Sequence, residues 1–187
     1  MHERTGGNPL EILQFLASLH AEGLLALDRE DMIWRWQLEP AVNRGLTDDL
    51  VVTKLAALPP DCRRLVDLLA CLGSEGEVEL LAELAELPPD LAHRRLLPAV
   101  RGGLLLARAD VYRFAHDRFR QTAYQAIPEH ERLAAHLRIG RQLRARWSPG
   151  GPSGPLFELV GQLNRALALC PDGEERLALA RLNRLAG

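Results

Sequence analysis

The chain has 187 residues, of which 47% are hydrophobic and 26% are charged, and its formal net charge is −2. That balance is typical of a globular protein, and so small a charge gives no global attraction to nucleic acid or anionic lipid. The three cysteines lack a Cys-x-x-Cys spacing, which argues against a disulfide framework or zinc site and favours a reducing, cytoplasmic location. With no signal segment and no apolar run near the roughly 18 residues of a membrane span, we expect no membrane partner.

The first predicted element is a helix that begins at Asn8 and ends at Gly23. Asn8 suits the N-cap position, Pro9 suits the first helical turn, and Gly23 supplies the left-handed residue that ends a helix. The start of this helix leaves backbone N–H groups unpaired, and Gly7 would let a ligand approach them closely. A plain helix start with no further role is the competing interpretation.

A β-hairpin is predicted after the first helix, from strand-like runs over 24–27 and 33–38 that flank a polar turn. On the second run, Trp34 and Trp36 share one face and are expected to pack in a core; a stacking surface is the alternative. A helix over 47–58 follows. The Pro59-Pro60 pair restricts the backbone before it and therefore marks a domain boundary.

The second predicted domain contains three short helices followed by a second β-hairpin. Gly73 and the Gly102-Gly103 pair end two of these helices. Three helices followed by a two-stranded hairpin are typical of a winged helix. These helices and strands are expected over residues 61–72, 77–87, 89–101, 104–108 and 111–115.

His116 and Asp117 follow the last of these strands and open a helix that ends before Pro128. The ring of His116 could reach an anion near the N-terminus of that helix. Asp117 could cap the helix or fix the tautomer of the histidine. A histidine with a purely structural role is the alternative. Three further helices, over 129–146, 155–169 and 173–185, complete the chain, and the last two resemble paired helices of an α-solenoid.

No catalytic constellation is present in the sequence. There is no Gly-x-x-x-x-Gly-Lys-Ser/Thr loop, and the only lysine, Lys54, lies in an apolar run without flanking glycines. No nucleophile lies in a recognisable frame with a base, and no histidines have metal-ligand spacing. We therefore expect no catalytic residue, no metal and no cofactor in this chain, which should not be an enzyme on its own.

A small winged-helix transcription regulator is the alternative function. Arg94, Arg95 and Arg101 lie on the helix that would enter the major groove. The segment 60–100 nevertheless has eight acidic residues against four arginines, a balance of −4, whereas phosphate contacts need a basic face. We therefore expect no nucleic-acid partner. A helical scaffold that binds protein partners through its C-terminal helices is a third option.

Several stretches in order along nearly the whole chain resemble the C-terminal part of the ATPase module of the STAND class, the signal-transduction ATPases with numerous domains. The similarity is to the form found in large bacterial regulators, including hybrid sensor histidine kinases and serine/threonine kinases. The matching stretches are Thr5-Gly6-Gly7-Asn8-Pro9-Leu10, Gln14-Phe15-Leu16, Leu19-His20, Trp34-Arg35-Trp36, Leu58-Pro59-Pro60, Ala70-Cys71-Leu72-Gly73, Tyr112-Arg113-Phe114-Ala115-His116-Asp117-Arg118, Ala123-Tyr124, His136-Leu137-Arg138-Ile139-Gly140, Leu163-Asn164-Arg165 and Leu182-Asn183.

The resemblance implies a mainly α fold with two small β-hairpins, divided into three domains. Residues 1–58 would form a helical lid segment, 59–127 a winged helix, and 128–187 the start of a tetratricopeptide-like helical array. The implied partners are a P-loop ATPase core, downstream signalling domains, and proteins that bind the helical repeats. The intact parent would be an ATPase that binds ADP or ATP with magnesium, and its output domain can be a kinase.

The resemblance also implies which residues contact nucleotide in the intact protein. A Gly-x-Pro motif lies by the adenine in this class, a role that passes to Gly7, Asn8 and Pro9. The histidine of a Met-His-Asp motif contacts the β-phosphate of ADP in the inactive state, a role that passes to His116 with Asp117 beside it. Alanine replaces the methionine of that motif here, which weakens the match at this position.

Overall fold

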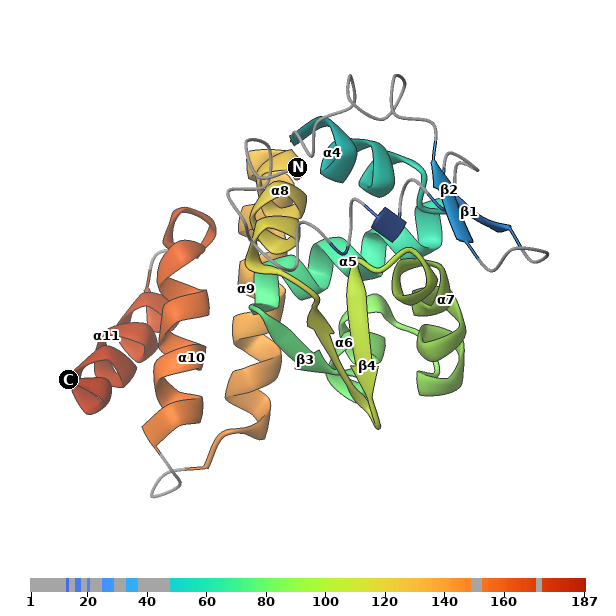
Figure 1. The fold of residues 1–187 in the computed structure, drawn as a ribbon. Coiled ribbons are helices and arrows are strands. Elements are labelled where there is room, and N and C mark those ends of the chain that lie inside the picture. The colour runs from blue at the N-terminus through green and yellow to red at the C-terminus, as the bar shows by residue number, and fades with distance from the viewer. Residues whose placement is uncertain are drawn as a thin grey trace. The chain divides into compact units, whose positions relative to one another are not determined.

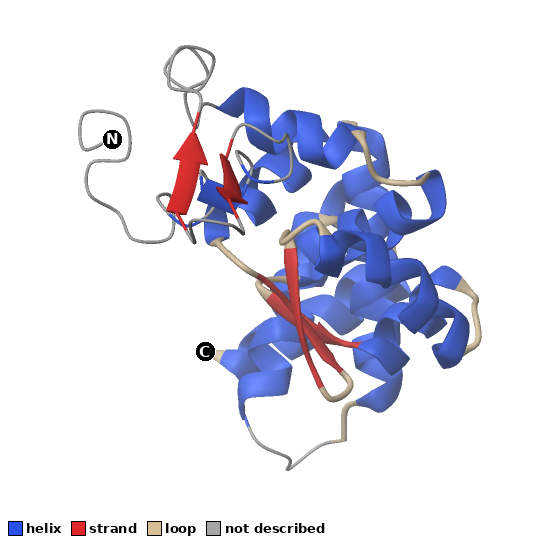
Figure 2. Ribbon diagram, turned by 45° about the vertical axis from the view of Figure 1, so that its right-hand side comes forward, coloured by secondary structure: helices blue, strands red, loops and turns tan. Residues whose placement is uncertain are grey.

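The protein forms two compact units, Met1–Ala56 and Ala57–Gly187, which are described separately. Most described residues are helical and two small antiparallel sheets accompany the helices, so the predicted mainly α fold with small β elements is confirmed (Figures 1 and 2). The computed structural model describes residues 13, 16, 17, 20, 25–28, 33–36, 48–148, 153–170 and 173–187.

The first unit contains the predicted hairpin. Strand β1, Leu25–Asp28, pairs antiparallel with β2, Ile33–Trp36, with Leu25 opposite Trp36. Helix α4, Asp48–Ala56, follows and matches the predicted helix over 47–58. The expected packing of Trp34 in a core was wrong, because its side chain is 54% exposed and its ring meets His20 edge-on at 5.8 Å. Two strands offer too little surface to enclose a tryptophan.

The second unit begins with a helix–strand–helix–helix–strand–strand order and continues with four more helices. Predicted and observed bounds agree within about three residues for most of these elements. A 3-10 turn, η1, Leu167–Leu169, separates the last two helices. The elements are α5 Pro60–Leu72, β3 Glu75–Glu77, α6 Val78–Ala85, α7 Pro89–Arg101, β4 Leu105–Arg108, β5 Val111–Phe114, α8 Asp117–Ala126, α9 Glu129–Arg146, α10 Ser153–Arg165 and α11 Glu174–Ala186.

The sheet of the second unit has three strands in the order β3-β5-β4, all antiparallel. Strand β3 was not predicted, because its sequence Glu-Gly-Glu has no apolar alternation and its pairing comes entirely from β5. Gly76 lies at its centre. A Cβ atom there would lie 2.5 Å from Cδ2 of Leu72, so this strand crosses close to α5.

Helix α5 lies at the centre of the second unit, in contact with α6, α7, α8 and α9. Its residues from Leu65 to Leu72 are nearly all buried, with only Asp67 partly exposed. Pro60 occupies its first turn and Gly73 follows its last, as the sequence predicts. A helix buried on almost every side is the core on which the neighbouring elements pack.

The helices α9, α10 and α11 form an apolar layer against one another. The approach of α9 to α10 is close, since a Cβ atom on Gly140 would lie 2.4 Å from Cδ2 of Leu163. The amides of Asn164 and Asn183 exchange hydrogen bonds of 2.9 and 3.1 Å between α10 and α11. The buried residues of this layer are Leu156, Leu159, Val160, Leu163, Leu179 and Leu182.

The unit boundary after Ala56 lies two residues before the predicted end of the lid at 58. Residues 57–187 form one compact unit, in which α9, predicted for the helical array, packs directly on α5, predicted for the winged helix. The division at residue 127 between a winged helix and a helical array therefore stays a prediction.

Candidate functional site

The N-terminal half of the predicted site, Gly7, Asn8 and Pro9, lies outside the described residues. Its role beside a nucleotide therefore stays a prediction. The other half, His116 and Asp117, lies at the junction between β5 and α8.

His116 is the N-cap of α8. Its backbone is extended, with φ −152° and ψ 146°, and its Nδ1 accepts a hydrogen bond of 3.1 Å from the backbone N–H of Arg118. This bond satisfies one of the N–H groups that a helix start leaves unpaired. The imidazole thus performs the capping role that serine or aspartate performs in most helices.

Capping fixes the tautomer of His116. Since Nδ1 accepts, the proton of the neutral ring lies on Nε2, which is a donor. Among the described residues Nε2 has no hydrogen-bond partner, and the side chain is only half-buried. Within the described ranges, His116 therefore presents an N–H donor without a partner at a helix N-terminus, an arrangement that suits an oxyanion.

Asp117 has a different role from the two suggested by the sequence. Its carboxylate accepts from Nε of Arg120 at 2.8 Å and from the side-chain amide of Gln121 at 2.6 Å. The hydrogen bond from Arg120 lowers the pKa of Asp117. The prediction that Asp117 caps the helix or fixes the histidine tautomer was wrong, because the carboxylate is bound by its own helix while His116 supplies the cap.

A buried hydrogen-bonded chain begins at the far end of α8. The hydroxyl of Tyr124 lies 2.9 Å from Nε2 of His136 on α9, and Nδ1 of His136 lies 2.6 Å from Oε1 of Gln162 on α10. The amide nitrogen of Gln162 then donates to the carbonyl oxygens of Cys71 and Leu72, each at 3.0 Å. Those carbonyls are among the unpaired ones at the C-terminal end of α5.

The positions of the protons along this hydrogen-bonded chain follow step by step, beginning at Gln162. The nitrogen of Gln162 must face the two carbonyls, so its oxygen accepts from Nδ1–H of His136. Nε2 of His136 is then an acceptor for the Tyr124 hydroxyl. Burial lowers the pKa of His136, and the charges of Arg165 and Arg132 lower it further, against the opposing hydrogen bond to Gln162. A neutral His136 thus joins four helices through three side chains.

A second histidine joins the β4–β5 hairpin to α7. Nδ1 of His93 lies 2.9 Å from the hydroxyl of Tyr112, and its Nε2 lies 3.6 Å from the carboxylate of Asp110. On the same helix, Arg95 pairs with Asp61 at 3.2 Å. Of the three arginines considered for DNA contact, one is thus committed to an ion pair within the fold.

Sequence reasoning assigned no chemistry to His136 and did not consider Gln162. His136 opens one of the stretches that resemble the STAND class, but the resemblance gave it no role; Gln162 lies in none of those stretches, and the two residues are 26 positions apart. The one available signal was a polar side chain on an otherwise apolar helix face, as at Gln162 between Gly161 and Leu163. That pattern indicates burial with a partner without identifying the partner.

No group of three or more histidine, cysteine, aspartate or glutamate side chains in the described ranges could hold a metal ion. No helix within those ranges has the length and apolar character to cross a membrane.

Comparison with known proteins gives one informative similarity. Hybrid signal transduction histidine kinase G of Dictyostelium discoideum is 25% identical over 240 aligned residues, which cover 98% of this chain. The chain spans about 7% of the length of that curated relative. No protein-family model matches the chain, and no solved structure matches it.

Proposed function

We propose that this chain is a regulatory segment of a multidomain signalling protein, in which it supplies the lid, winged helix and first helical repeats of a STAND-class nucleotide switch. The similarity to a hybrid signal transduction histidine kinase supports a signalling role. The small share of that relative which the chain covers is in keeping with one segment of a larger assembly.

The order of elements in the second unit supports the winged-helix assignment. It reads α5-β3-α6-α7-β4-β5, with β5 between the other two strands. A short first strand that joins a C-terminal hairpin is the arrangement expected of a winged helix, in which the β4–β5 turn is the wing. The residues after Ile127 continue as helices, as an array of helical pairs requires.

The observation that carries the proposal is the state of His116. Its Nδ1 is used for capping, and its Nε2–H has no partner among the described residues. A donor of this kind at a helix N-terminus can bind the β-phosphate of ADP held by a P-loop core, the role that the family resemblance implies. Gly7, Asn8 and Pro9 would approach the adenine from the lid.

The buried chain from Tyr124 to Gln162 gives such a contact a route to the helical repeats. His116 and Tyr124 lie on the same helix, α8, which moves as a rigid element if its N-terminus moves. Tyr124 binds His136 of α9, and His136 binds Gln162 of α10. A shift of α8 would therefore change the packing of the array. Exchange of ADP for ATP would act by favouring one of two such arrangements.

In this proposal the chain has no catalytic role of its own. A P-loop core in the same cytoplasmic parent would bind ATP with magnesium and hydrolyse it, and a kinase or other output domain would respond. Proteins that bind the helical repeats would be the remaining partners.

The test is substitution of His116 in the full-length parent, with bound nucleotide and output activity as readouts. His116→Leu removes both the cap and the Nε2 donor, and it should lower the amount of ADP that copurifies and raise basal output. His116→Asn keeps a capping acceptor, because an asparagine oxygen can replace Nδ1, but it has no donor at the position of Nε2.

If His116→Asn is as stable as the wild type and still loses ADP, the histidine acts on nucleotide and not only on the helix. Full ADP retention and unchanged output in both variants would overturn the proposal. Loss of ADP in His116→Leu alone would reduce His116 to a capping residue.

A further inference from the structure

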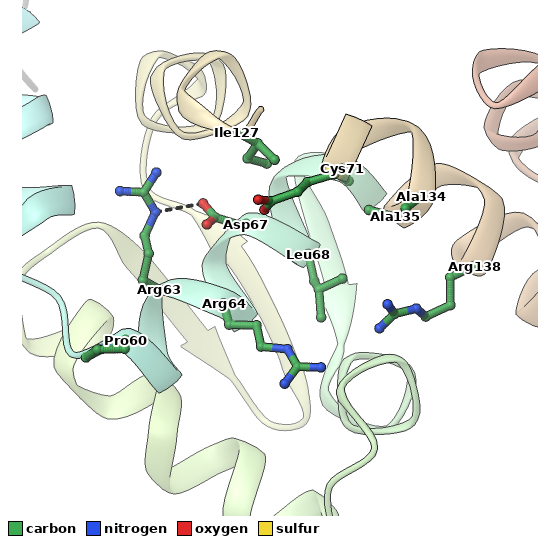
Figure 3. Close-up of a pocket in the computed structure, with 11 residues that line it drawn as sticks. Pro60, Arg63, Arg64, Asp67, Leu68, Cys71, Ile127, Ala134, Ala135 and Arg138 are labelled. Atoms are coloured by element: carbon green, nitrogen blue, oxygen red, sulfur yellow. Dashed lines mark hydrogen bonds and ion pairs between the residues drawn. The ribbon is translucent and has the colours of Figure 1, made fainter. Parts of the chain in front are cut away.

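A pocket of about 420 Å³ lies between α5 and α9, with the residue after α8 at its rim (Figure 3). The His116 site contributes no residue to it. Its volume lies within the range of about 300–1,000 Å³ that small-molecule sites occupy. The lining contains both charged and apolar side chains.

Two arginines turn toward one another across this pocket. Figure 3 shows the guanidinium of Arg64, from α5, directed toward that of Arg138, from α9. One nitrogen of Arg138 donates to the carbonyl oxygen of Leu84 at 2.8 Å, which holds its guanidinium in place. Neither arginine has an acidic partner in the described part of the chain. Two facing cations repel each other, and an anion between them would remove that cost.

The remaining charges of the pocket nearly cancel. Arg63 donates to the carboxylate of Asp67 at 2.7 Å, so these two neutralise each other. Glu131 is the one further acidic residue of the lining. Three arginines against two carboxylates leave a residual charge of +1, which matches an anion of a single charge.

The rest of the wall is apolar. It consists of Pro60, Leu68, Cys71 and Ile127 with two small alanines of α9. Burial raises the pKa of Cys71 to about 12, with the charge of Asp67 adding to the effect, so the thiol stays neutral and is no nucleophile. This surface suits an alkyl chain rather than a second polar group.

We propose that the α5–α9 pocket binds a carboxylate that carries a short aliphatic stem, with the carboxylate between Arg64 and Arg138 and the stem against Leu68. Planar guanidinium groups bind carboxylates through paired, charge-assisted hydrogen bonds. A phosphate monoester carries a charge between about −1.5 and −2 at pH 7, which would exceed the residual charge and meet repulsion from Asp67 and Glu131.

The carboxylate has two sources in principle, a free small acid or the side chain of a glutamate in another polypeptide. Both contain the same group on a short stem. Titrations with butyrate and with a blocked Ala-Glu-Ala tripeptide distinguish them, because only the tripeptide contains peptide groups that must also fit at the mouth of the pocket.

The experiment is a titration of the ¹⁵N-labelled chain followed by NMR, at constant ionic strength and pH 7. The shifts of the backbone amides of Arg64, Leu68 and Arg138 report binding. The probes are butyrate, acetate, butyramide, inorganic phosphate and the tripeptide. Butyrate should bind more tightly than acetate, which lacks the stem, and than butyramide, which has the same shape without the charge.

The variants Arg64→Gln and Arg138→Gln should each weaken butyrate binding by about tenfold, since each removes a charge-assisted contact. Arg94→Gln on α7 and Arg144→Gln on α9 are the matched controls. Both controls remove an exposed helical arginine outside the pocket lining, and they should leave the dissociation constant unchanged.

Equal binding of butyrate and butyramide would overturn the proposal, as would equal weakening by the pocket and control variants. Tighter binding of phosphate than of butyrate would overturn the assignment to a carboxylate. Binding of the tripeptide at least as tightly as butyrate would assign the site to an acidic side chain of a protein partner, and weaker binding would assign it to a small acid. None of these outcomes depends on nucleotide, so the result is separate from the test of His116.

Discussion

His116 caps the start of α8, and His136 binds Tyr124 near the end of the same helix. The two histidines differ in burial and in hydrogen bonding. The side chain of His116 is half-buried and makes one hydrogen bond in the described part of the chain, so its Nε2 can gain or lose a partner at little cost. His136 is 2% exposed, and both of its nitrogens are bound within the protein. A group that detects a ligand needs an unused hydrogen-bond donor or acceptor, whereas a group that transmits a movement needs all of its donors and acceptors bound within the protein. In the proposed switch, these two tasks would fall to two residues of the same type.

The largest effect that would test this comparison is expected from Gln162→Leu. The substitution leaves Nδ1–H of His136 and the carbonyls of Cys71 and Leu72 without partners inside the core. We expect the free energy of unfolding to fall by about 2–4 kcal/mol. Urea denaturation would measure it. Gln125→Leu on the exposed side of α8 is the control and should change stability by less than about 0.5 kcal/mol; equal losses would mean that the buried chain contributes nothing.

A pair of glycines tests how closely α9 and α10 are packed. A Cβ atom at Gly140 would lie 2.4 Å from the side chain of Leu163 and 3.3 Å from its backbone nitrogen, whereas one at Gly161 would meet nothing within 4 Å. Gly140→Ala should therefore destabilise the protein by about 1–3 kcal/mol. Gly161→Ala should stabilise it by about 0.5–1 kcal/mol, because alanine favours helix. Thermal denaturation of both variants would show opposite shifts, and shifts of the same sign would contradict the packing of α9 on α10.

A further effect concerns the pH dependence of stability. Burial holds the pKa of His136 below its ordinary value of 6.5, so the unfolded chain binds a proton that the folded chain rejects as the pH falls through 6.5. The free energy of unfolding should therefore decrease from pH 7 toward the lowered pKa and should lose no more from this group below it. Denaturation series between pH 7.0 and 5.5 would measure the slope, which His136→Gln should reduce and the exposed His130→Gln should retain. A slope that survives in His136→Gln would assign it to other groups.

The smallest expected effect on stability is from substitution of His116. His116→Ala removes the cap of α8 and should cost about 0.5–1 kcal/mol, whereas His116→Asn should cost only a few tenths. Chemical denaturation of the purified chain would resolve the difference. If both substitutions were equally costly, the bond from Arg118 to Nδ1 would not be what stabilises this helix start.

Most helices of the second unit were predictable because their boundaries are local. Proline pairs begin α5 and α7, glycines follow their last turns, and apolar residues at helical spacing lie between. Strand β3 was not predictable, because its short polar sequence becomes a strand only when β5 lies beside it. Local chemistry fixes where an element starts and stops, while pairing with a distant partner decides whether a weak segment adopts structure at all.

The candidate site also contains features that the sequence could predict and features that it could not. His116 was recognisable because a strand, a histidine and a helix start are consecutive in the sequence. The role of Asp117 was predicted wrongly because its partners, Arg120 and Gln121, compete for the same carboxylate from one turn away. Gln162 was invisible because its meaning depends on Cys71 and Leu72, which are 91 and 90 positions earlier.

The long sequence separation between Gln162 and its partners in α5 affects how the protein folds during synthesis. On the ribosome, α5 is synthesised long before the glutamine that completes its C-terminal end, and it must wait for α10 with two carbonyls still hydrated. Contacts of such long sequence separation form late and slow the search for the native state. A nascent chain halted after Ile127 would therefore have the elements from α5 to α8 without their finished core, and release of α10 from the exit tunnel would set the moment at which this unit closes.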